Sequence, residues 1–348
     1  MIEIVDLNAR AGDFRLRDIN LRIERGEYFV LLGPTGAGKT FLIECICGLR
    51  HVESGRILIN GRDVTNLDPA TRNVGYVPQD YALFPTMTVY DNMAFGLKVK
   101  RASDVRKKVL KTAKMLRIED LLERYPQTLS GGEKQRVAVG RAIVTEPDVL
   151  LMDEPLSALD PATGELLARE LRRVQRETGI TTIHVCHNFE EMLMVADRAG
   201  VLNKGRLIQV GEADEIFRRP ETEFVARFVR SRNVFTGKAA CRNGKCDISI
   251  GALTIRCPGK AEGEIRLSIR PEEISISPSK PEGKCDNLFA GVIRRIENKG
   301  ALTEVEVDVG VNLISWTLTP TFARMRLNVG DRAYVRFDGN SVNIIRKA

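Results

Sequence analysis

The sequence predicts an α/β domain built on a parallel sheet, followed by a smaller all-β domain. Residues 27–32 form a continuous apolar strand that ends in a glycine loop, and a helical segment follows the loop. Apolar strands return at 148–152 and 181–186 with a helical segment at 163–177 between them. This alternation is typical of a parallel sheet covered by helices. From Asn233 onward, short alternating strands separated by Gly and Pro replace the helices, as in an all-β domain.

The composition is that of a globular protein with packed cores. The 348 residues are 43% hydrophobic and 28% charged, and their number fits about two domains. No apolar run approaches the ~20 residues of a membrane-spanning helix. The N-terminus also does not have the basic and then apolar pattern of a secretion signal. We therefore expect a chain that neither spans a membrane nor is secreted.

The seven cysteines do not have the spacing of a metal or redox site. Their number is odd and none of them forms a C-x-x-C motif, which fits a reducing compartment. Cys45, Cys47 and Cys186 lie in apolar stretches, so we expect them to pack in the core as small apolar side chains. Cys241 and Cys246 could pair across a hairpin, and the sequence leaves that pairing open.

The positive charge is concentrated in the C-terminal third. The formal net charge is +7, of which residues 1–230 contribute +1 and residues 231–348 contribute +6. A basic domain could meet nucleic acid, an anionic ligand or lipid headgroups. An excess of this size is also what an ordinary solvated surface carries, and we favour that interpretation.

Residues 33–40, GPTGAGKT, match the phosphate-binding loop G-x-x-x-x-G-K-[ST] in full. Glycines in this loop let successive backbone N–H groups turn toward a polyphosphate, and the following helix directs its positive N-terminal end at the same anion. We expect Lys39 to bridge the β- and γ-phosphates of a nucleotide, and Thr40 to supply a hydroxyl ligand to Mg²⁺. The predicted nucleotide-binding residues are Gly33, Pro34, Thr35, Gly36, Ala37, Gly38, Lys39 and Thr40.

Two carboxylates end the apolar strand at 149–152. Next to a phosphate loop, Asp153 is expected to hold Mg²⁺. Glu154 is expected to act as a general base that polarises the attacking water, because the end of a buried strand holds a side chain rigidly. An acidic pair at a strand end is usually a solvated turn, but together with a phosphate loop it indicates a hydrolase.

Residues 129–136, LSGGEKQR, begin a helical segment. Ser130 and Glu133 have the spacing of a capping box. Gly131 and Gly132 leave backbone N–H groups available to an anion. This segment resembles the signature motif of the ATP-binding-cassette (ABC) ATPases.

Further motifs of that family follow the expected order. Gln79, in YVPQD, is similar to the Q-loop glutamine, which in the family contacts Mg²⁺ and the water and senses the membrane subunit. Residues 157–160, SALD, resemble the D-loop, which makes Asp160 a candidate nucleotide-site residue. His187 is similar to the switch histidine that contacts the γ-phosphate in this family. The family usually has Asp after that histidine, whereas this chain has Asn188.

Phe14 lies where the family stacks an aromatic ring on adenine, although the family often has Tyr there. Phe14 also fits an ordinary strand residue, because aromatic side chains fill half-buried strands readily. His184 lies within a strand and is expected to be a hydrogen-bonded core histidine, and His51 is expected at the surface.

The resemblance implies the fold in more detail. Residues 1–232 are expected to form an ABC ATPase domain of the α/β P-loop NTPase class, with a RecA-like core, an antiparallel β subdomain and a helical subdomain at about 80–150. Residues 233–348 resemble the all-β, OB-fold-like domain called TOBE or MOP, which follows the ATPase domain in some importers. The segments 268–272, SIRPE, and 300–310, GALTEVEVDVG, carry that likeness.

The same resemblance implies a set of partners. One chain carries one phosphate loop and one signature motif, so we expect a homodimer that binds two ATP molecules at a symmetric interface. Two membrane-spanning permease subunits and an extracytoplasmic substrate-binding protein are also implied, with the ATPase peripheral at the cytoplasmic face of the cell membrane. Residues 81–87 are expected to dock a helix of the membrane partner or, alternatively, to fill the core of the helical subdomain.

The implied function is the ATP-hydrolysing subunit of a molybdate or tungstate importer. Residues 33–40, 81–89 and 187–191 are similar to the ATPase subunits of such importers. An importer ATPase for sulfate, iron, a polyamine or a sugar is the alternative. A second alternative is a soluble ABC ATPase that acts on nucleic acid. Such proteins usually have two cassettes or a long coiled-coil insertion, neither of which appears in this sequence, so no nucleic-acid partner is expected. A third alternative, an adenylate-type kinase, would leave the signature motif without a purpose.

Molybdate-binding modules of the TOBE/MOP type use a small-hydroxyl segment and a late basic residue. Here the corresponding places are 319–323, TPTFA, and 338–341, DGNS. An acid where a base is expected repels an oxyanion. We therefore expect that the β domain does not bind the transported ion tightly.

Overall fold

The computed structural model describes residues 1–242, 244–283 and 285–345, which fall into two compact units. The first unit is Met1–Asp214 and the second is Glu215–Ala348. The all-β pattern starts at Asn233, as the sequence predicts. The second unit also includes α8 (Glu223–Phe228) and most of α7 (Ala213–Arg218), although the sequence places the boundary at residue 232.

Hydrogen bonds account for this difference. The amide of Asn343 donates to the carbonyl oxygen of Pro220 at 2.8 Å, and the guanidinium of Arg270 donates to that of Phe217 at 2.9 Å. The segment before Asn233 is therefore tied to the β domain by contacts that its own helical sequence does not reveal.

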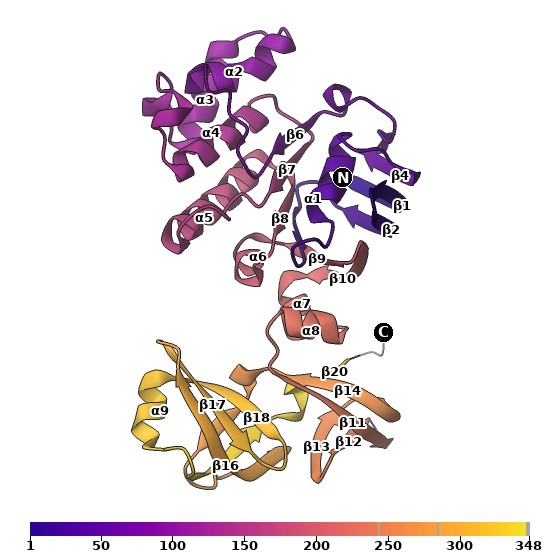
Figure 1. Cartoon of the computed structure of the whole chain (residues 1–348), viewed down its shortest axis with the longest axis vertical. Coiled ribbons are helices and arrows are strands. Elements are labelled where there is room, and N and C mark those ends of the chain that lie inside the picture. Colours follow the sequence, from indigo (N-terminus) through magenta and orange to yellow (C-terminus); the bar gives the residue numbers. More distant parts are fainter. Residues whose placement is uncertain (243, 284, 346–348) are drawn as a thin grey trace. The chain divides into compact units, whose positions relative to one another are not determined.

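A six-stranded sheet lies at the centre of the first unit (Figure 1). Across the sheet its strands are β10 (Arg206–Glu212), β9 (Arg198–Asn203), β3 (Tyr28–Leu32), β8 (Thr181–Cys186), β7 (Val149–Asp153) and β6 (Val74–Val77). All pairs in it are parallel except β9 with β10. Every residue of β3, β7 and β8 is buried, which explains their continuous apolar sequences. The carboxyl ends of these three strands meet at one edge of the sheet.

A four-stranded antiparallel sheet forms a second layer of the first unit. Its order is β2 (Phe14–Ile23), β1 (Ile2–Ala11), β4 (Ser54–Ile59) and β5 (Arg62–Asp63). One core joins the alternating apolar residues of this sheet, helix α1 (Lys39–Cys47) and the central strands. Cys45 and Cys47 are buried in that core and Cys186 is buried at the end of β8, so the core packing expected of these cysteines is confirmed.

The helical subdomain follows β6. It contains α2 (Val89–Val99), α3 (Val105–Leu116) and α4 (Gly131–Ile143), with short 3₁₀ turns at Pro69–Thr71, Glu119–Leu121 and Pro126–Thr128 along this part of the chain. In Figure 1 these three helices gather on the side of β6 and β7 away from the antiparallel sheet. Two more helices, α5 (Pro161–Thr178) and α6 (Phe189–Val195), follow β7 and β8. The central sheet, the antiparallel sheet and the helical subdomain are the three parts expected of an ABC ATPase domain. No helix among the described residues is long and apolar enough to cross a membrane.

The second unit is built from two five-stranded antiparallel sheets in its described residues. The first has the order β13 (Leu253–Pro258), β12 (Lys245–Ile250), β11 (Asn233–Arg242), β14 (Gly263–Ile269) and β20 (Val342–Ile345). The second has the order β15 (Ser275–Ser277), β19 (Arg332–Phe337), β16 (Asn287–Asn298), β17 (Leu302–Asp308) and β18 (Asn312–Leu318), with α9 (Thr319–Met325) after it and 3₁₀ turns at Pro271–Glu273 and Gly339–Ser341. One apolar core contains residues from both sheets, so the predicted all-β domain is confirmed.

Cys241 and Cys246 form a disulfide between β11 and β12. These residues are also partners in the strand register, and Cys257 on β13 is the register partner of Cys246. The pairing that the sequence leaves open is therefore made in this structure.

Candidate active site

The phosphate-binding loop connects the carboxyl end of β3 to α1. A Cβ on Gly33 would lie 2.2 Å from the carbonyl oxygen of Leu202, so the loop passes too close to β9 for any side chain there. Gly36 and Gly38 have φ angles of 79° and 104°, which L side chains rarely adopt. Gly38 has no side chain with which to cap α1, so the N–H groups of the first helical turn are available to an anion.

Lys39 is held inside this loop. Its Nζ donates to the carbonyl oxygen of Gly33 at 2.8 Å and to that of Pro34 at 3.1 Å. The side chain is buried, and burial lowers the pKa of the ammonium while the carboxylates of Glu154 and Asp153 act in the opposite direction. The ammonium is thus positioned by the loop that is expected to bind phosphates.

Thr40 and Asp153 meet at the edge of the sheet. The Thr40 hydroxyl donates to Oδ1 of Asp153 at 3.1 Å. Asp153 is 3% exposed, and burial raises the pKa of its carboxyl group. Gln79 joins both residues in lining a cavity of about 580 Å³. The other residues that line this cavity are Glu44, Tyr76, Pro78, Asp80, Ser157 and Ala158.

The oxygen donors in this cavity fit a magnesium ion. A hydroxyl, a carboxylate and a side-chain amide are the hard ligands that Mg²⁺ takes, and a cation beside Asp153 would offset the cost of burying its charge. The described residues contain no cluster of three or more His, Cys, Asp or Glu side chains that could hold a metal ion.

The ends of β7 and β8 bring Glu154 and His187 together. Nδ1 of His187 lies 3.5 Å from Oε2 of Glu154. The backbone of Glu154 has a φ of 45°, and its N–H donates to the carbonyl oxygen of Val185 at 3.0 Å, which fixes it against β8. The His187 side chain is 55% exposed, so its imidazole remains accessible to a ligand.

The signature segment begins α4, at a different part of the first unit. The Ser130 hydroxyl accepts from the N–H of Glu133 at 3.4 Å, and the Glu133 carboxylate accepts from the N–H of Ser130 at 2.7 Å, so the predicted capping box is present. Among the described residues, those that line the cavity at Thr40 and Asp153 do not include Ser130, Gly131 or Gly132.

Asp160 and Phe14 lie at the margins of the site. Asp160 is the N-cap of α5 and accepts from the N–H of Thr163 at 3.1 Å, and this hydrogen bonding lowers the pKa of its carboxyl group. Phe14, the first residue of β2, packs edge-on to Phe41 with ring centroids 6.1 Å apart. A Cβ on Gly38 would lie 2.5 Å from the Phe14 ring, which puts this ring directly against the phosphate loop.

Two further contacts involve residues that the motifs do not include. Glu44 lies four residues after Thr40 on α1, and helical periodicity could have placed both on one face. Arg141 on α4 donates to the carbonyl oxygens of Ala82 at 2.5 Å and Tyr81 at 2.8 Å. No local sequence signal predicts that contact, because its partners are about sixty residues away along the chain.

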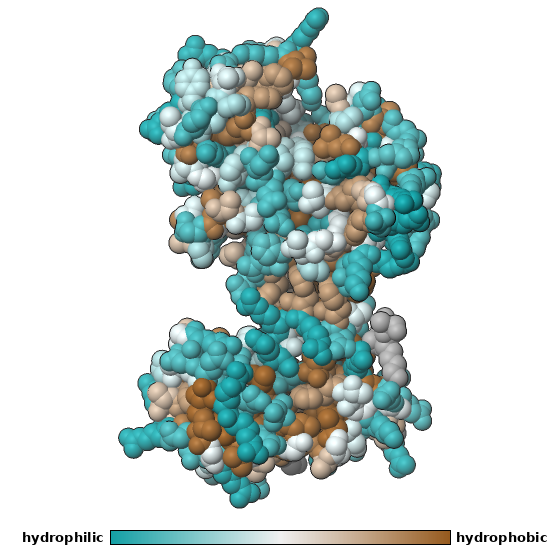
Figure 2. Space-filling model, in the orientation of Figure 1, coloured by the Kyte–Doolittle hydropathy of each residue, from teal (hydrophilic) through white to brown (hydrophobic). Residues whose placement is uncertain are grey.

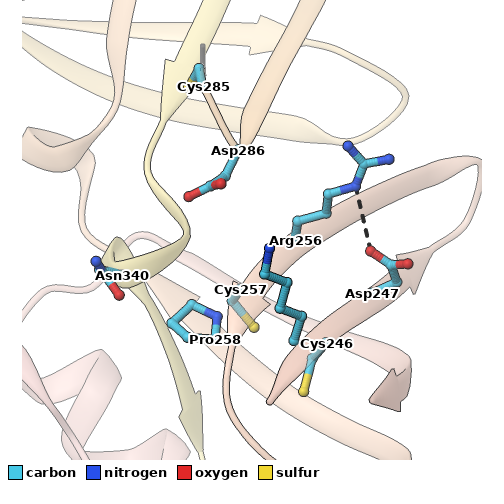
Figure 3. A pocket seen from close by; sticks show the side chains of 9 residues that line it. Cys246, Asp247, Arg256, Cys257, Pro258, Cys285, Asp286 and Asn340 are labelled. Atoms are coloured by element: carbon cyan, nitrogen blue, oxygen red, sulfur yellow. Dashed lines mark ion pairs between the residues drawn. The ribbon is translucent and has the colours of Figure 1, made fainter. Parts of the chain in front are cut away.

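The second unit has a cavity of about 520 Å³ between its strands, and the charges around it are mixed (Figure 3). Arg256 is paired with Asp247 at 3.5 Å, and Asp286 lies on the opposite side of the cavity. Asn340 also lines the cavity. Two residues before it is Asp338, the acid at the place where molybdate-binding modules of this type have a base. The hydroxyl segment, residues 319–323, forms the first five residues of α9.

Comparison with known proteins identifies the class. The family model of the ABC transporter matches residues 16–157, and the model of the TOBE domain matches residues 267–344. A relative from Pyrococcus horikoshii is 41% identical over 347 residues, which are 99% of this chain and 99% of the relative. The chain therefore belongs to the ATP-binding proteins of ABC transporters, and it is an ATPase of that type.

The names of these relatives concern inorganic anions. The Pyrococcus horikoshii protein is the molybdate/tungstate import ATP-binding protein WtpC. The sulfate/thiosulfate import ATP-binding protein CysA of Caulobacter vibrioides is 39% identical over 339 residues, which are 96% of this chain and 94% of the relative. Among solved structures, the dimeric post-hydrolysis state of the cassette MJ0796 bound to ADP and Pi is 29% identical, with a TM-score of 0.55, over 61% of this chain and 99% of that one.

Proposed function

We propose that this chain is the ATP-hydrolysing subunit of an importer for molybdate or tungstate. The observation that carries the proposal is the likeness over 99% of the chain to a molybdate/tungstate import ATP-binding protein, with both domains included. A sulfate importer is the second candidate, because a sulfate/thiosulfate ATP-binding protein is 39% identical over 96% of the chain. All three anions are tetrahedral oxyanions, so the ATPase can be closely similar while partner proteins select the ion.

The chemistry begins with ATP bound by the phosphate loop. The N–H groups at the start of α1 and the Lys39 ammonium bind the phosphates, with Lys39 exchanging its loop carbonyls for the stronger charged acceptor. Thr40, Gln79 and Asp153 would hold Mg²⁺, which would neutralise charge on the phosphates.

The hydrolytic step uses the ends of β7 and β8. Glu154 accepts the proton of the attacking water as general base, since its backbone is fixed by the bond to β8. His187, 3.5 Å from that carboxylate, contacts the γ-phosphate and links it to the base. Their proximity in the nucleotide-free chain supports this pairing of roles.

A homodimer completes the site. Gly131 and Gly132 expose the N–H groups of a second capped helix start, but in this chain they do not line the cavity beside the phosphate loop. The signature segment of one chain, which includes Ser130, and the D-loop residue Asp160 therefore bind the nucleotide held by the partner's phosphate loop. Phe14 borders the same loop and stacks on the adenine ring.

The segment 81–87 is the docking surface for a helix of the membrane-spanning partner. None of residues 81–87 is buried, which supports a surface role over a role in the core of the subdomain. A cavity of about 240 Å³ separates this segment from the turn before α4. The residues that line it are Asp80, Tyr81, Leu83, Pro85, Pro126, Gln127 and Lys134, so apolar side chains are flanked by charges. Such a cavity fits the apolar face of a short helix.

Two permease subunits and an extracytoplasmic binding protein complete the assembly at the cytoplasmic face of the membrane. The β domain in this proposal does not hold the transported ion tightly. Arg256, which lines the cavity of about 520 Å³, is paired with Asp247, and Asp286 adds a second carboxylate. Arg270 nearby is engaged by Glu272 and lies 3.5 Å from the ring of Phe217.

Reconstitution with the partners tests the choice of ion. The permease and binding protein are co-purified with this chain, and ATPase activity is measured with the binding protein loaded with molybdate, tungstate or sulfate in turn. We expect molybdate or tungstate to give the greater stimulation at a saturating concentration of binding protein. Stimulation by sulfate alone would assign the chain to the second candidate.

A further inference from the structure

A buried cluster of polar side chains links three elements behind the active site. Tyr28 begins β3, His184 lies in the middle of β8, and Glu191 lies in the first turn of α6. The hydroxyl of Tyr28 is 2.9 Å from Nδ1 of His184, and Oε1 of Glu191 is 2.7 Å from Nε2. Tyr28 and His184 are fully buried and Glu191 is 9% exposed. We call these three residues the buried polar cluster.

One protonation pattern suits all three groups. Burial, and secondarily the charge of Glu191, raises the pKa of Tyr28 well above its ordinary value, so the phenol stays protonated and donates to Nδ1. Nε2 then carries the ring proton and faces the Glu191 carboxylate. Neither Nε2 nor Oε1 meets hydrogen-bond geometry with any atom of the described residues, so their contact with each other is what offsets their burial.

The cluster acts on the chain segment that carries His187. His187 directly precedes Asn188, the N-cap of α6, and Glu191 follows His187 by four residues. The Asn188 side chain accepts from the N–H of Glu190 at 2.8 Å, so an Asn serves this cap as an Asp would. His187 itself is 55% exposed and contacts Glu154. The position of its imidazole therefore depends on how the first turn of α6 is anchored to the sheet.

We propose that His184 is a positioning residue for ATP hydrolysis. Through Glu191 it ties the first turn of α6 to β8, and through Tyr28 it ties β8 to β3, the strand that leads into the phosphate loop. The cluster thereby holds the His187 imidazole beside Glu154. This inference rests on the role of His187 that is proposed above.

The direct test replaces His184 by Phe in the full-length chain, which keeps a ring but removes both nitrogens. We expect kcat for ATP hydrolysis to fall about tenfold, because a small displacement of a reacting group is costly, while KM and nucleotide affinity stay within about twofold. His51→Phe is the matched control, since His51 is exposed and lies outside the cluster, and it should leave kcat unchanged.

Smaller changes to the buried polar cluster test the same inference with less risk that the chain fails to fold. Tyr28→Phe removes one oxygen atom but leaves Nδ1 of His184 without its donor, so we expect kcat to fall about threefold and the melting temperature to fall by a few degrees. Glu191→Gln keeps a polar group opposite Nε2 and should retain more activity than Glu191→Leu. Wild-type kcat in both His184→Phe and Tyr28→Phe would overturn the inference.

A double-mutant cycle separates positioning from a general structural effect. In a His187→Ala background, His184→Phe should cause no further loss of kcat, because the residue through which it acts is gone. Loss of the same tenfold factor in that background overturns the inference. If His187→Ala alone leaves kcat unchanged, the proposed role of His187 fails and the inference fails with it. If His187→Ala lowers kcat but His184→Phe does not, the inference fails while the proposed role of His187 stands.

Discussion

The two anion-binding helix starts of the ATPase domain differ in what surrounds them. The start of α1 lies at the edge of the central sheet, with Lys39 and Asp153 buried beside it and a cavity in front of Thr40. The start of α4 is capped by its own Ser130 and Glu133, and it does not line that cavity. The first is a nearly complete catalytic site without its partner, whereas the second is a preformed surface without catalytic groups. Under the proposed function, this difference explains why one chain contains both helix starts and works with a second copy.

The largest expected effect removes the general base at the first site. Glu154→Gln keeps the shape of the side chain but cannot accept a proton, so kcat should fall by about 10²- to 10⁴-fold. ATP binding should persist, and a dimer with ATP should accumulate on size-exclusion chromatography. An unaltered turnover rate would exclude Glu154 as the base.

The next effect in size separates binding from hydrolysis at the same site. Lys39→Ala removes the ammonium that the carbonyls of Gly33 and Pro34 hold, so ATP affinity should fall about 10- to 100-fold, as for loss of a charged hydrogen bond. Fluorescence titration with a labelled nucleotide measures the change. Wild-type affinity would mean that the backbone N–H groups bind the phosphates without Lys39.

A smaller effect is expected at the second helix start. Ser130→Ala removes the hydroxyl of the capping box, which should cost about 1 kcal/mol of stability. It should lower kcat about tenfold in the dimer and leave the ATP affinity of the monomer unchanged, since Ser130 does not line the phosphate-loop cavity. A loss of monomer affinity equal to that of Lys39→Ala would erase the difference between the two regions.

The smallest effect is on the stability of the nucleotide-free chain. Burial raises the pKa of Asp153 in the folded state, so folding is most favoured below the ordinary carboxyl pKa, and that advantage disappears as pH rises through the raised value. Asp153→Asn removes the buried charge, so at neutral pH its melting temperature should exceed that of the wild type by about 2 °C, although it is inactive. The gap should narrow as the pH is lowered in a thermal scan, and a constant gap would contradict the electrostatic cause.

The sequence predicts the parts of this site that are contiguous in the chain. The phosphate loop, the Asp153–Glu154 pair and the capped start at Ser130 are local patterns with local physical reasons, and the structure contains each of them. The parallel strands follow from their apolar runs. The contact of Glu154 with His187, each of which follows one of these strands, is seen only in the structure.

The remaining parts depend on contacts between distant segments. Tyr28 and His184 are 156 residues apart in the chain, and nothing near either residue indicates their pairing. The contacts of Arg141 with the segment 81–87 have the same origin. The short strand β15 likewise has no local signal, because Ser275–Ser277 belongs to a stretch rich in Pro and Ser and becomes a strand only by pairing with β19.

Complementation between two inactive chains tests the shared site most directly. Lys39→Ala damages the phosphate loop, and Gly131→Asp adds a negative charge that favours the helix start but repels a phosphate. Each variant alone should be inactive. After 1:1 mixing, half of the dimers pair unlike chains and each has one intact composite site, so about one quarter of wild-type ATPase activity should return. If no activity above that of the separate variants appears, each chain hydrolyses ATP with its own signature segment, and the account of a shared site is wrong.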